Sequence, residues 1–360
     1  MNKHHYVAIM AGGIGSRFWP MSRTNFPKQF LDILNTGETL IQQTFDRYKA
    51  FIPVENIYIV TSQEYVGVVK AQLPELPVEN IVAEPSRKNT APCVAYIAFK
   101  LFQKDPEAVM MAAPADNYIL DTAAFTAVAL NALEFVSNHD ALVTIGIQPT
   151  HPNTGYGYIQ YDGPEKANNV YKVKTFTEKP TLEIAKTFIE SGDFLWNAGI
   201  FTWKIKTILD AFEKYLPEMH ELFATEKDKL NTAEETKAIE TIYPQCTSIS
   251  IDFGVMEKAN NVYVIPASFA WSDLGTWNSA WDNMEKDYFQ NAVAGDHVMV
   301  VDANSCMVHV PDNKLVLLQG LEGYIVVDTK DVLMICKKEK EQEIKEYVAE
   351  IKRNKGDKFL

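Results

Sequence analysis

The sequence has few cysteines and no long apolar run. Its four cysteines lie far apart, form no C-x-x-C pair and give no reason to expect a zinc site or a disulfide framework. The seven histidines form no H-E-x-x-H or H-x-x-x-H pair. No run of about 18 apolar residues occurs, and the N-terminus enters the apolar stretch "HHYVAIM" without a signal core. We therefore expect a cytoplasmic protein with no membrane partner.

Acidic residues are absent from residues 1–30, although they are in excess over the whole chain. The chain has 47 Asp and Glu against 34 Lys and Arg, a formal net charge of −13, which does not favour nucleic acid as a partner. Residues 1–30 instead contain four basic residues, Lys3, Arg17, Arg23 and Lys28. This local positive charge predicts an anion site.

Short β-branched runs alternate with longer amphipathic runs up to about Gly146. Examples are "YVAIM", "NIYIV", "AVMMAA" and "ALVTIGI" as strands, with "TAPCVAYIAFKLF" and residues 122–138 as helices. The alternation predicts βαβ units, and so an α/β fold with a mainly parallel sheet. Strand-rich stretches then follow, with helices at "TLEIAKTFIES" and within 205–243.

Short strands dominate after about residue 288, before a charged terminal helix. The runs "HVMVV", "CMVHV", "LVLLQ", "YIVVDT" and "VLMIC" predict a small β-domain, for which a solenoid and a barrel both remain open. We therefore expect a catalytic domain at 1–287 and a small β-domain at 288–360.

The glycine-rich segment "MAGGIGSRFWPMSRTNFPKQF" follows the first predicted strand, where ligands bind in open α/β sheets. It lacks the Gly-Lys-Ser/Thr of a P-loop, and the dinucleotide pattern Gly13-x-Gly15-x-x ends on Phe18 instead of a small residue. A different phosphate loop remains, in which glycines allow close backbone approach and Arg17 and Lys28 bind phosphate oxygens. The alternative is a glycine turn with basic residues on a solvated face.

Several motifs in order along residues 5–282 resemble those of the sugar-1-phosphate nucleotidylyltransferases. They are the glycine-rich segment, "EPSRKNTAPCVAYIA", "APADNYI", "PTHPNTGYGYIQ", "FTEKP", "WNAGIFTW", "SIDFGVMEK" and "WSDLGTW". The resemblance is closest to the bacterial members that make GDP-mannose. It implies a Rossmann-like mixed, mainly parallel sheet flanked by helices, of the nucleotide-diphospho-sugar transferase type, followed by a small left-handed β-helix.

The implied reaction is GMP transfer from GTP to mannose 1-phosphate with release of pyrophosphate. Catalysis of this kind depends on positioning and charge stabilisation. The resemblance implies that Asp116 and Asp273 hold Mg²⁺, a hard cation that takes one or two carboxylates. It also makes Arg17 and Lys28 the cations that stabilise the transition state. Taken alone, each aspartate could equally be a helix cap or an Asx-turn residue.

The other implied contacts fall into two groups. Around the nucleotide we expect Ala11, Gly12, Gly13, Gly15, Ser16, Arg17, Lys28, Asn89, Thr90 and Asp116. Around the sugar phosphate we expect Gly157, Glu178, Lys179, Asn197 and Asp273. Simple structural roles remain open for several: Asn89 or Thr90 as a helix N-cap, Gly157 as a bulge, Glu178 with Lys179 as an exposed pair, and Asn197 as a turn residue. Arg23, Arg87 and Lys88 could belong to the phosphate cluster or be structural.

Two other functions remain open. A nucleotidylyltransferase for another sugar 1-phosphate would keep nearly every motif. An inactive nucleotide-sugar sensor would lose Arg17, Lys28 or a metal aspartate, and all are present. The segment after Asn291 is too short for the cupin-like isomerase domain of longer family members, so we expect a monofunctional enzyme. We further expect a homodimer, with dimer contacts in the C-terminal strands, whose residues are apolar.

Overall fold

The computed structural model describes residues 1–13 and 15–360, apart from the side chains at 162 and 164. The chain divides into two compact units. The first comprises residues 1–12, 45–115 and 119–271, and the second comprises residues 13–44, 116–118 and 272–360. In the described part of the chain, no helix is long and apolar enough to cross a membrane.

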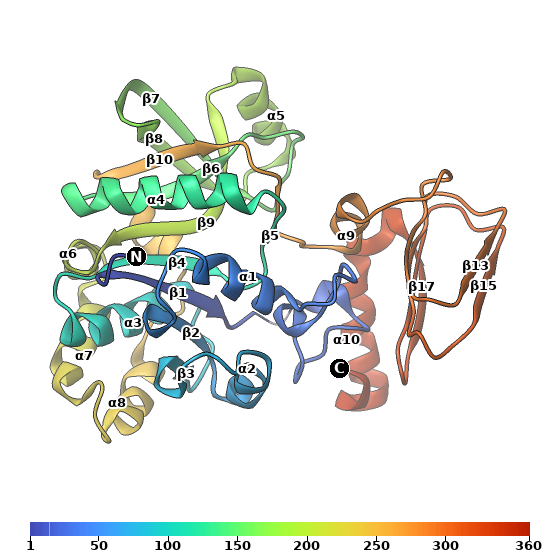
Figure 1. The fold of residues 1–360 in the computed structure, drawn as a ribbon, viewed down its shortest axis with the longest axis horizontal. Helices are drawn as coiled ribbons and strands as arrows, with labels where there is room; N and C mark the ends of the chain where they lie inside the picture. The colour runs from blue at the N-terminus through green and yellow to red at the C-terminus, as the bar shows by residue number, and fades with distance from the viewer. Residues whose placement is uncertain (14) are drawn as a thin grey trace. The chain divides into compact units, whose positions relative to one another are not determined.

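A nine-stranded sheet, in the order β3-β2-β1-β4-β9-β6-β10-β8-β7, forms the centre of the first unit (Figure 1). Its strands are β1 (His5–Ala11), β2 (Ile57–Ser62), β3 (Ile81–Glu84), β4 (Val109–Pro114), β6 (Leu142–Ile147), β7 (Gly157–Ala167), β8 (Val170–Glu178), β9 (Phe194–Lys204) and β10 (Val262–Ala267). Strands β1 to β4 are parallel to one another, as the βαβ alternation predicts, whereas β9 runs antiparallel to both β4 and β6. The sheet is therefore mixed.

Helices pack on the sheet where its central strands, β1, β2, β4 and β6, are buried along most of their length. The helices of this unit are α2 (Val66–Gln72), α3 (Thr90–Lys104), α4 (Thr122–Asn138), α5 (Leu182–Ser191), α6 (Ile205–Tyr215), α7 (Pro217–Glu226) and α8 (Glu235–Ile242), and α1 (Leu40–Lys49) begins in the second unit. Helix α4 packs on β4, β6, β9 and β10, and α3 packs on α6 and α7.

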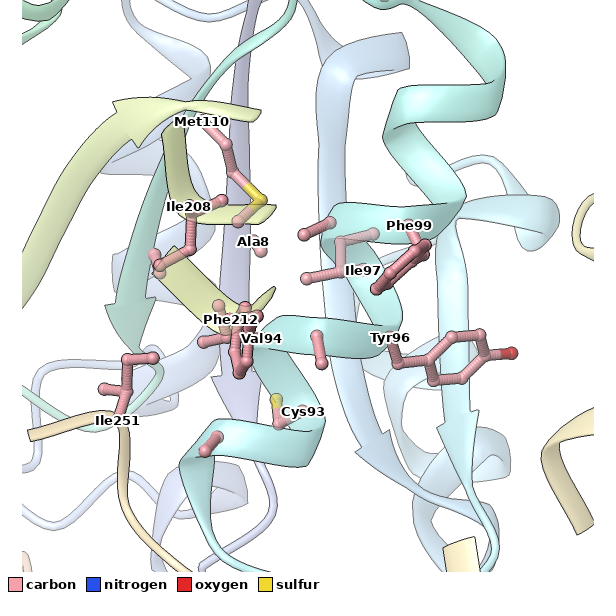
Figure 2. Packing of buried hydrophobic residues seen from close by; sticks show 14 of the residues in the cluster. Ala8, Cys93, Val94, Tyr96, Ile97, Phe99, Met110, Ile208, Phe212 and Ile251 are labelled. Atoms are coloured by element: carbon pink, nitrogen blue, oxygen red, sulfur yellow. The ribbon is translucent and has the colours of Figure 1, made fainter. Parts of the chain in front are cut away.

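The core beneath α3 and α6 is fully buried (Figure 2). Ala8 and Met110 of the sheet meet Val94 and Ile97 of α3 and Phe212 of α6 within one cluster. Cys93 of α3 and Met110 and Met111 of β4 are all buried.

The second unit contains a small stack of short strands and the C-terminal helix α10 (Ile344–Lys355). The strands are β12 (Ala292–Ala294), β13 (Val298–Val301), β14 (Met307–His309), β15 (Val316–Gln319), β16 (Tyr324–Asp328) and β17 (Leu333–Lys337). Strands β12, β14 and β16 pair in parallel, as do β13 and β15, whereas β17 closes the stack antiparallel to β16. Parallel pairing between successive turns of the chain is the arrangement of a solenoid and not of an up-and-down barrel.

A separate hydrophobic core ties this stack to the N-terminal loop. Phe18 and Trp19 of residues 13–44 pack with Trp277 of α9 (Trp277–Asn283), Met307 of β14 and Ile344 of α10. Trp277 is fully buried in this core. The two short strands β5 (Tyr118–Ile119) and β11 (Trp271–Ser272) lie where the chain passes from one unit to the other.

Candidate functional site

The glycine-rich loop begins where β1 ends. Ala11 closes the strand, and its carbonyl accepts a hydrogen bond from Thr61 at 2.8 Å. Gly12 follows within the first unit. Its α-carbon faces Glu84, because a Cβ placed there would lie 3.6 Å from Oε2 of that carboxyl.

In the second unit, Gly15 has the conformation that requires glycine. Its φ of 64° is left-handed, and a Cβ would overlap the side chain of Lys28. The Gly15 carbonyl accepts from Ser22 Oγ at 2.7 Å, and the Gly13 carbonyl accepts from Gln29 Nε2 at 3.0 Å. A short 3-10 turn, Ser16–Phe18, comes next. The loop therefore has a defined shape, held by residues 22–29 of the same segment.

Lys28 brings together the two aspartates predicted to hold a metal. It is almost completely buried, with 4% of its surface exposed. Its Nζ donates to Asp116 Oδ2 at 2.9 Å and to the backbone carbonyl of Asp273 at 2.5 Å. Asp116 follows β4, and Asp273 lies in the turn after β11, where its Oδ1 accepts from Gly275 N at 3.0 Å. These three residues, distant in sequence, thus meet around one ammonium group.

The donor set at this point suits Mg²⁺. Mg²⁺ prefers hard oxygen ligands and usually takes one or two carboxylates from a protein. Its other ligands are water molecules and substrate phosphates. Across the described residues, no group of three or more His, Cys, Asp or Glu side chains is arranged to hold a metal ion. A metal at Asp116 and Asp273 would take its remaining ligands from water and substrate phosphates.

The two arginines of the loop have different surroundings. Arg17 is partly buried, and its Nε has no hydrogen-bond partner among the described residues. Burial, together with the positive charge of Arg17, lowers the pKa of Lys345 on α10. Arg23 instead donates to the Phe359 carbonyl at 2.6 Å and to Asp331 at 2.8 Å. Arg23 is thus engaged in structural bonds, whereas Arg17 keeps a donor for an anion.

In the first unit, the N-terminus of α3 carries the motif predicted to read the base. Asn89 is the N-cap, and its Oδ1 accepts from Thr90 N at 2.9 Å. The Thr90 hydroxyl accepts from Ile251 N at 2.8 Å, so it fastens residues 249–251 to the helix. Arg87 is bonded to Tyr65 and to Glu64, and Lys88 reaches the Pro244 carbonyl at 3.4 Å.

Glu84 lies at the end of β3, beside the motif of Asn89 and Thr90. Its side chain is buried and accepts a hydrogen bond from Tyr243 Oη at 2.9 Å. Burial raises the pKa of Glu84 to about 7, and the hydrogen bond from Tyr243 opposes that rise. This residue was not among the predicted site residues, although an acid directly after the apolar run "NIVA" was a visible signal.

Three of the residues predicted to bind the sugar phosphate converge on adjacent strands. Gly157 opens β7 opposite Glu178 at the end of β8, and Asn197 lies in β9. A Cβ on Gly157 would overlap Glu178 Oε2 and would lie 3.3 Å from the Asn197 Cβ. The Glu178 carboxylate, 12% exposed, pairs with Lys179 Nζ at 2.9 Å, whereas the lysine side chain is 63% exposed. Asn197 is a strand residue and not the turn residue considered from sequence.

Asp252 is a further acid of this cluster that was not singled out in the sequence. It begins a π-helical turn, Asp252–Met256, and its Oδ1 accepts from Asn197 Nδ2 at 2.9 Å. Burial, with the nearby negative charge of Glu178, raises the pKa of Asp252 to about 6. Its signal in the sequence was its place in the quoted motif "SIDFGVMEK", but nothing local to that motif indicates Asn197 as its partner.

Comparison with known proteins places these features in a family. The model described as nucleotidyl transferase matches residues 6–289, and the model described as MannoseP isomerase/GMP-like beta-helix domain matches residues 295–351. The chain is 37% identical over 349 residues to the alginate biosynthesis protein AlgA of Pseudomonas syringae, covering 95% of this chain and 70% of that protein. It is 33% identical over 356 residues to the mannose-1-phosphate guanylyltransferase of Escherichia coli, covering 98% and 74%.

A solved structure supports the same assignment over both units. A protein of Thermus thermophilus, described as a mannose-1-phosphate geranyltransferase, is similar with a TM-score of 0.87 and 30% identity, covering 97% of this chain and 99% of that one. The expected mixed α/β sheet with a small C-terminal β-domain is thereby confirmed. The chain belongs to the nucleotidyl transferase family and carries a MannoseP isomerase/GMP-like beta-helix domain after it.

Proposed function

We propose that this protein transfers GMP from GTP to α-D-mannose 1-phosphate, giving GDP-mannose and pyrophosphate. Relatives named mannose-1-phosphate guanylyltransferase, similar over nearly the whole chain, support the substrates. The observation that carries the proposal is the meeting of Lys28 with Asp116 and Asp273 beside a glycine-rich loop. A triphosphate with its metal requires cationic side chains, two carboxylates and glycines that let the backbone approach the phosphates.

The site residues of the second unit bind the triphosphate and its metal. Gly13 and Gly15 offer backbone to phosphate oxygens, Arg17 binds the β- and γ-phosphates, and Lys28 binds near the α-phosphate. The two carboxylates would hold Mg²⁺, which supplies positive charge against the triphosphate and the departing pyrophosphate. Since Lys28 donates to Asp116 within the protein, its ammonium is held at that carboxylate before the nucleotide binds.

The first-unit residues bind the base and the sugar phosphate. Asn89, with its side chain exposed at the start of α3, is the base contact, and Thr90 supports it. Glu178 accepts hydrogen bonds from sugar hydroxyls, Asn197 donates one, and the exposed ammonium of Lys179 neutralises the 1-phosphate.

The chemical step is an in-line displacement that needs no covalent intermediate. An oxygen of the sugar 1-phosphate forms a bond to the α-phosphorus of GTP while the bond from that phosphorus to the β-bridging oxygen breaks. Lys28 neutralises the charge on the α-phosphoryl oxygens, and Arg17 neutralises the charge that accumulates on pyrophosphate. We further propose that the enzyme acts in the cytoplasm, where such triphosphates are made, and that it is a homodimer.

The test is pyrophosphate release by purified protein with Mg²⁺, over a grid of GTP, ATP, UTP, CTP and dTTP against mannose, glucose and other sugar 1-phosphates. A single strong signal for GTP with mannose 1-phosphate is the expected result. A signal with another sugar would retain the mechanism and replace the substrate. If no pair of substrates released pyrophosphate while the protein still bound GDP-mannose, an inactive sensor would be favoured instead.

A further inference from the structure

Asn197 is held by three hydrogen bonds that define the orientation of its side-chain amide. Its Oδ1 accepts from Thr144 Oγ1 at 3.0 Å and from Gly199 N at 3.1 Å, while its Nδ2 donates to Asp252 Oδ1 at 2.9 Å. A backbone N–H can only donate, so Gly199 identifies the oxygen end of the amide without ambiguity. The nitrogen end therefore points to Asp252.

The amide has one donor that these bonds leave unused. A primary amide offers two N–H donors and one oxygen with two lone pairs. Both lone pairs and one N–H are engaged, and among the described residues the second N–H has no partner. Asn197 also lies against Gly157 and thus beside Glu178, the two other residues assigned to the sugar phosphate. One amide proton is thereby available at that cluster.

Asp252 is itself held in place from the other direction. The backbone of the preceding residues is fastened to α3, because Ala91 N donates to the Ile249 carbonyl at 3.0 Å and Ile251 N donates to Thr90 Oγ1 at 2.8 Å. The carboxylate thus reaches Asn197 from a segment anchored on a buried helix.

Resting on the proposed function, we propose that Asp252 is a positioning residue for the sugar phosphate: it holds the Asn197 amide so that its remaining N–H is presented to a sugar hydroxyl. A substrate hydroxyl is the matching group because it can accept this N–H while donating its own proton to Glu178. Asp252 acts through Asn197 and has no role in the displacement itself.

Three variants test this inference by steady-state kinetics at pH 8. Asp252→Ala removes the acceptor, so KM for mannose 1-phosphate is expected to rise about tenfold or more, a factor equivalent to ~1.4 kcal/mol, with KM for GTP within about twofold. Asp252→Asn keeps an acceptor oxygen, so KM for the sugar phosphate should stay within about threefold of the wild-type value. Asp210→Ala, an exposed aspartate on α6, is the matched control and should change neither KM.

The double variant Asn197→Asp with Asp252→Asn reverses the hydrogen bond. The new carboxylate accepts from Thr144, from Gly199 and from the new amide, so the link within the protein is retained while the N–H for the sugar is lost. Thermal stability should therefore exceed that of Asp252→Ala, with KM for the sugar phosphate still raised. Recovery of that KM in the double variant would overturn the inference, as would an unchanged KM in Asp252→Ala.

A measurement without turnover separates this inference from the proposed function. In ligand-free protein labelled with ¹⁵N, the side-chain amide resonance of Asn197 should shift in Asp252→Ala and stay in place in Asp210→Ala. An unshifted resonance would refute the positioning role. If wild-type protein makes no GDP-mannose, the proposed function falls, whereas the resonance still reports whether Asp252 orients Asn197.

Discussion

At the residue scale, the buried ammonium of Lys28 connects sequence positions that no local pattern joins. Asp116 and Asp273 belong to separate motifs, and each could have been a simple turn residue. Lys28 Nζ joins the carboxylate of Asp116 to the backbone carbonyl of Asp273, so the two residues predicted to bind the metal contact the same ammonium group. This geometry also gives the sharpest tests of single side chains.

Asp273→Asn is expected to reduce turnover by at least about 100-fold, because a neutral amide binds Mg²⁺ more weakly than a carboxylate. Unfolding temperature should change little, since an amide oxygen can still accept from Gly275 N. Turnover is measured against Mg²⁺ concentration, with the exposed Asp282→Asn on α9 as the matched control. Wild-type turnover in Asp273→Asn would remove this residue from the metal site.

Glu84→Gln is expected to stabilise the protein at alkaline pH. Because burial raises the pKa of Glu84 from 4.5 to about 7, folding favours its protonated form. The free energy of unfolding therefore contains a contribution from the protonated Glu84. This contribution is complete below pH 4.5 and is lost as the pH rises through about 7. The shift corresponds to about 3 kcal/mol at most.

Thermal unfolding of wild type and Glu84→Gln between pH 5 and pH 8 checks this. The two should be close at pH 5, and the variant should be the more stable at pH 8, since its amide remains neutral and still accepts from Tyr243. Glu79→Gln, at an exposed position, should follow the wild type throughout. If the unfolding temperatures of wild type and Glu84→Gln changed with pH in the same way, the raised pKa of Glu84 would be contradicted.

At the element scale, the shape of the glycine-rich loop depends on one backbone conformation. Gly15→Ala is expected to lower stability by about 1–2 kcal/mol, because alanine is strained at a φ of 64° and its Cβ would overlap Lys28. Displacing Lys28 should also raise KM for GTP.

Gly13→Ala is the matched control for Gly15→Ala. A Cβ on Gly13 would meet no atom within 4 Å, and its backbone does not adopt a positive φ. The free energy of unfolding of the Gly13→Ala variant, measured with urea, should stay within about 0.5 kcal/mol of the wild-type value. Equal losses in the two variants would show that Gly15 has no special backbone requirement.

At the scale of the whole molecule, the end of the chain supports the loop at its beginning. The Phe359 carbonyl accepts from Trp19 Nε1 at 2.7 Å and from Arg23 Nη1 at 2.6 Å. Both donors belong to the segment that positions Lys28, and all of these residues lie in the second unit. The C-terminal segment therefore contributes to a loop more than three hundred residues earlier in the sequence.

Deletion of residues 356–360 should lower the unfolding temperature and raise KM for GTP. Removing the acceptor of two hydrogen bonds, one of them charged, costs about 1–3 kcal/mol. Deletion of Leu360 alone leaves Phe359 as the terminal carboxylate, whose oxygens can still accept from Trp19 and Arg23, and is the control. Calorimetry and GTP kinetics on both truncations provide the test, and identical behaviour would exclude this support for the loop.

Much of the fold followed from local patterns. The apolar runs predicted most strands, and the helices at 122–138 and at "TAPCVAYIAFKLF" are confirmed as α4 and α3. The direction of β9 was not predictable, since strand pairing depends on distant segments. Arg23 could not be assigned for the same reason: Phe359 and Asp331, its partners, are remote in sequence.

The amino-acid sequence by itself determined the family and the chemical character of the site, because ordered motifs and residue types are properties of the chain. It predicted which glycines, cations and aspartates serve the nucleotidyl transfer. Only the tertiary structure decided which residues meet: Lys28 with Asp116 and Asp273, and Asn197 with Asp252. The physical reason is that burial, hydrogen-bond partners and shifted pKa values arise between residues that meet only when the chain has folded.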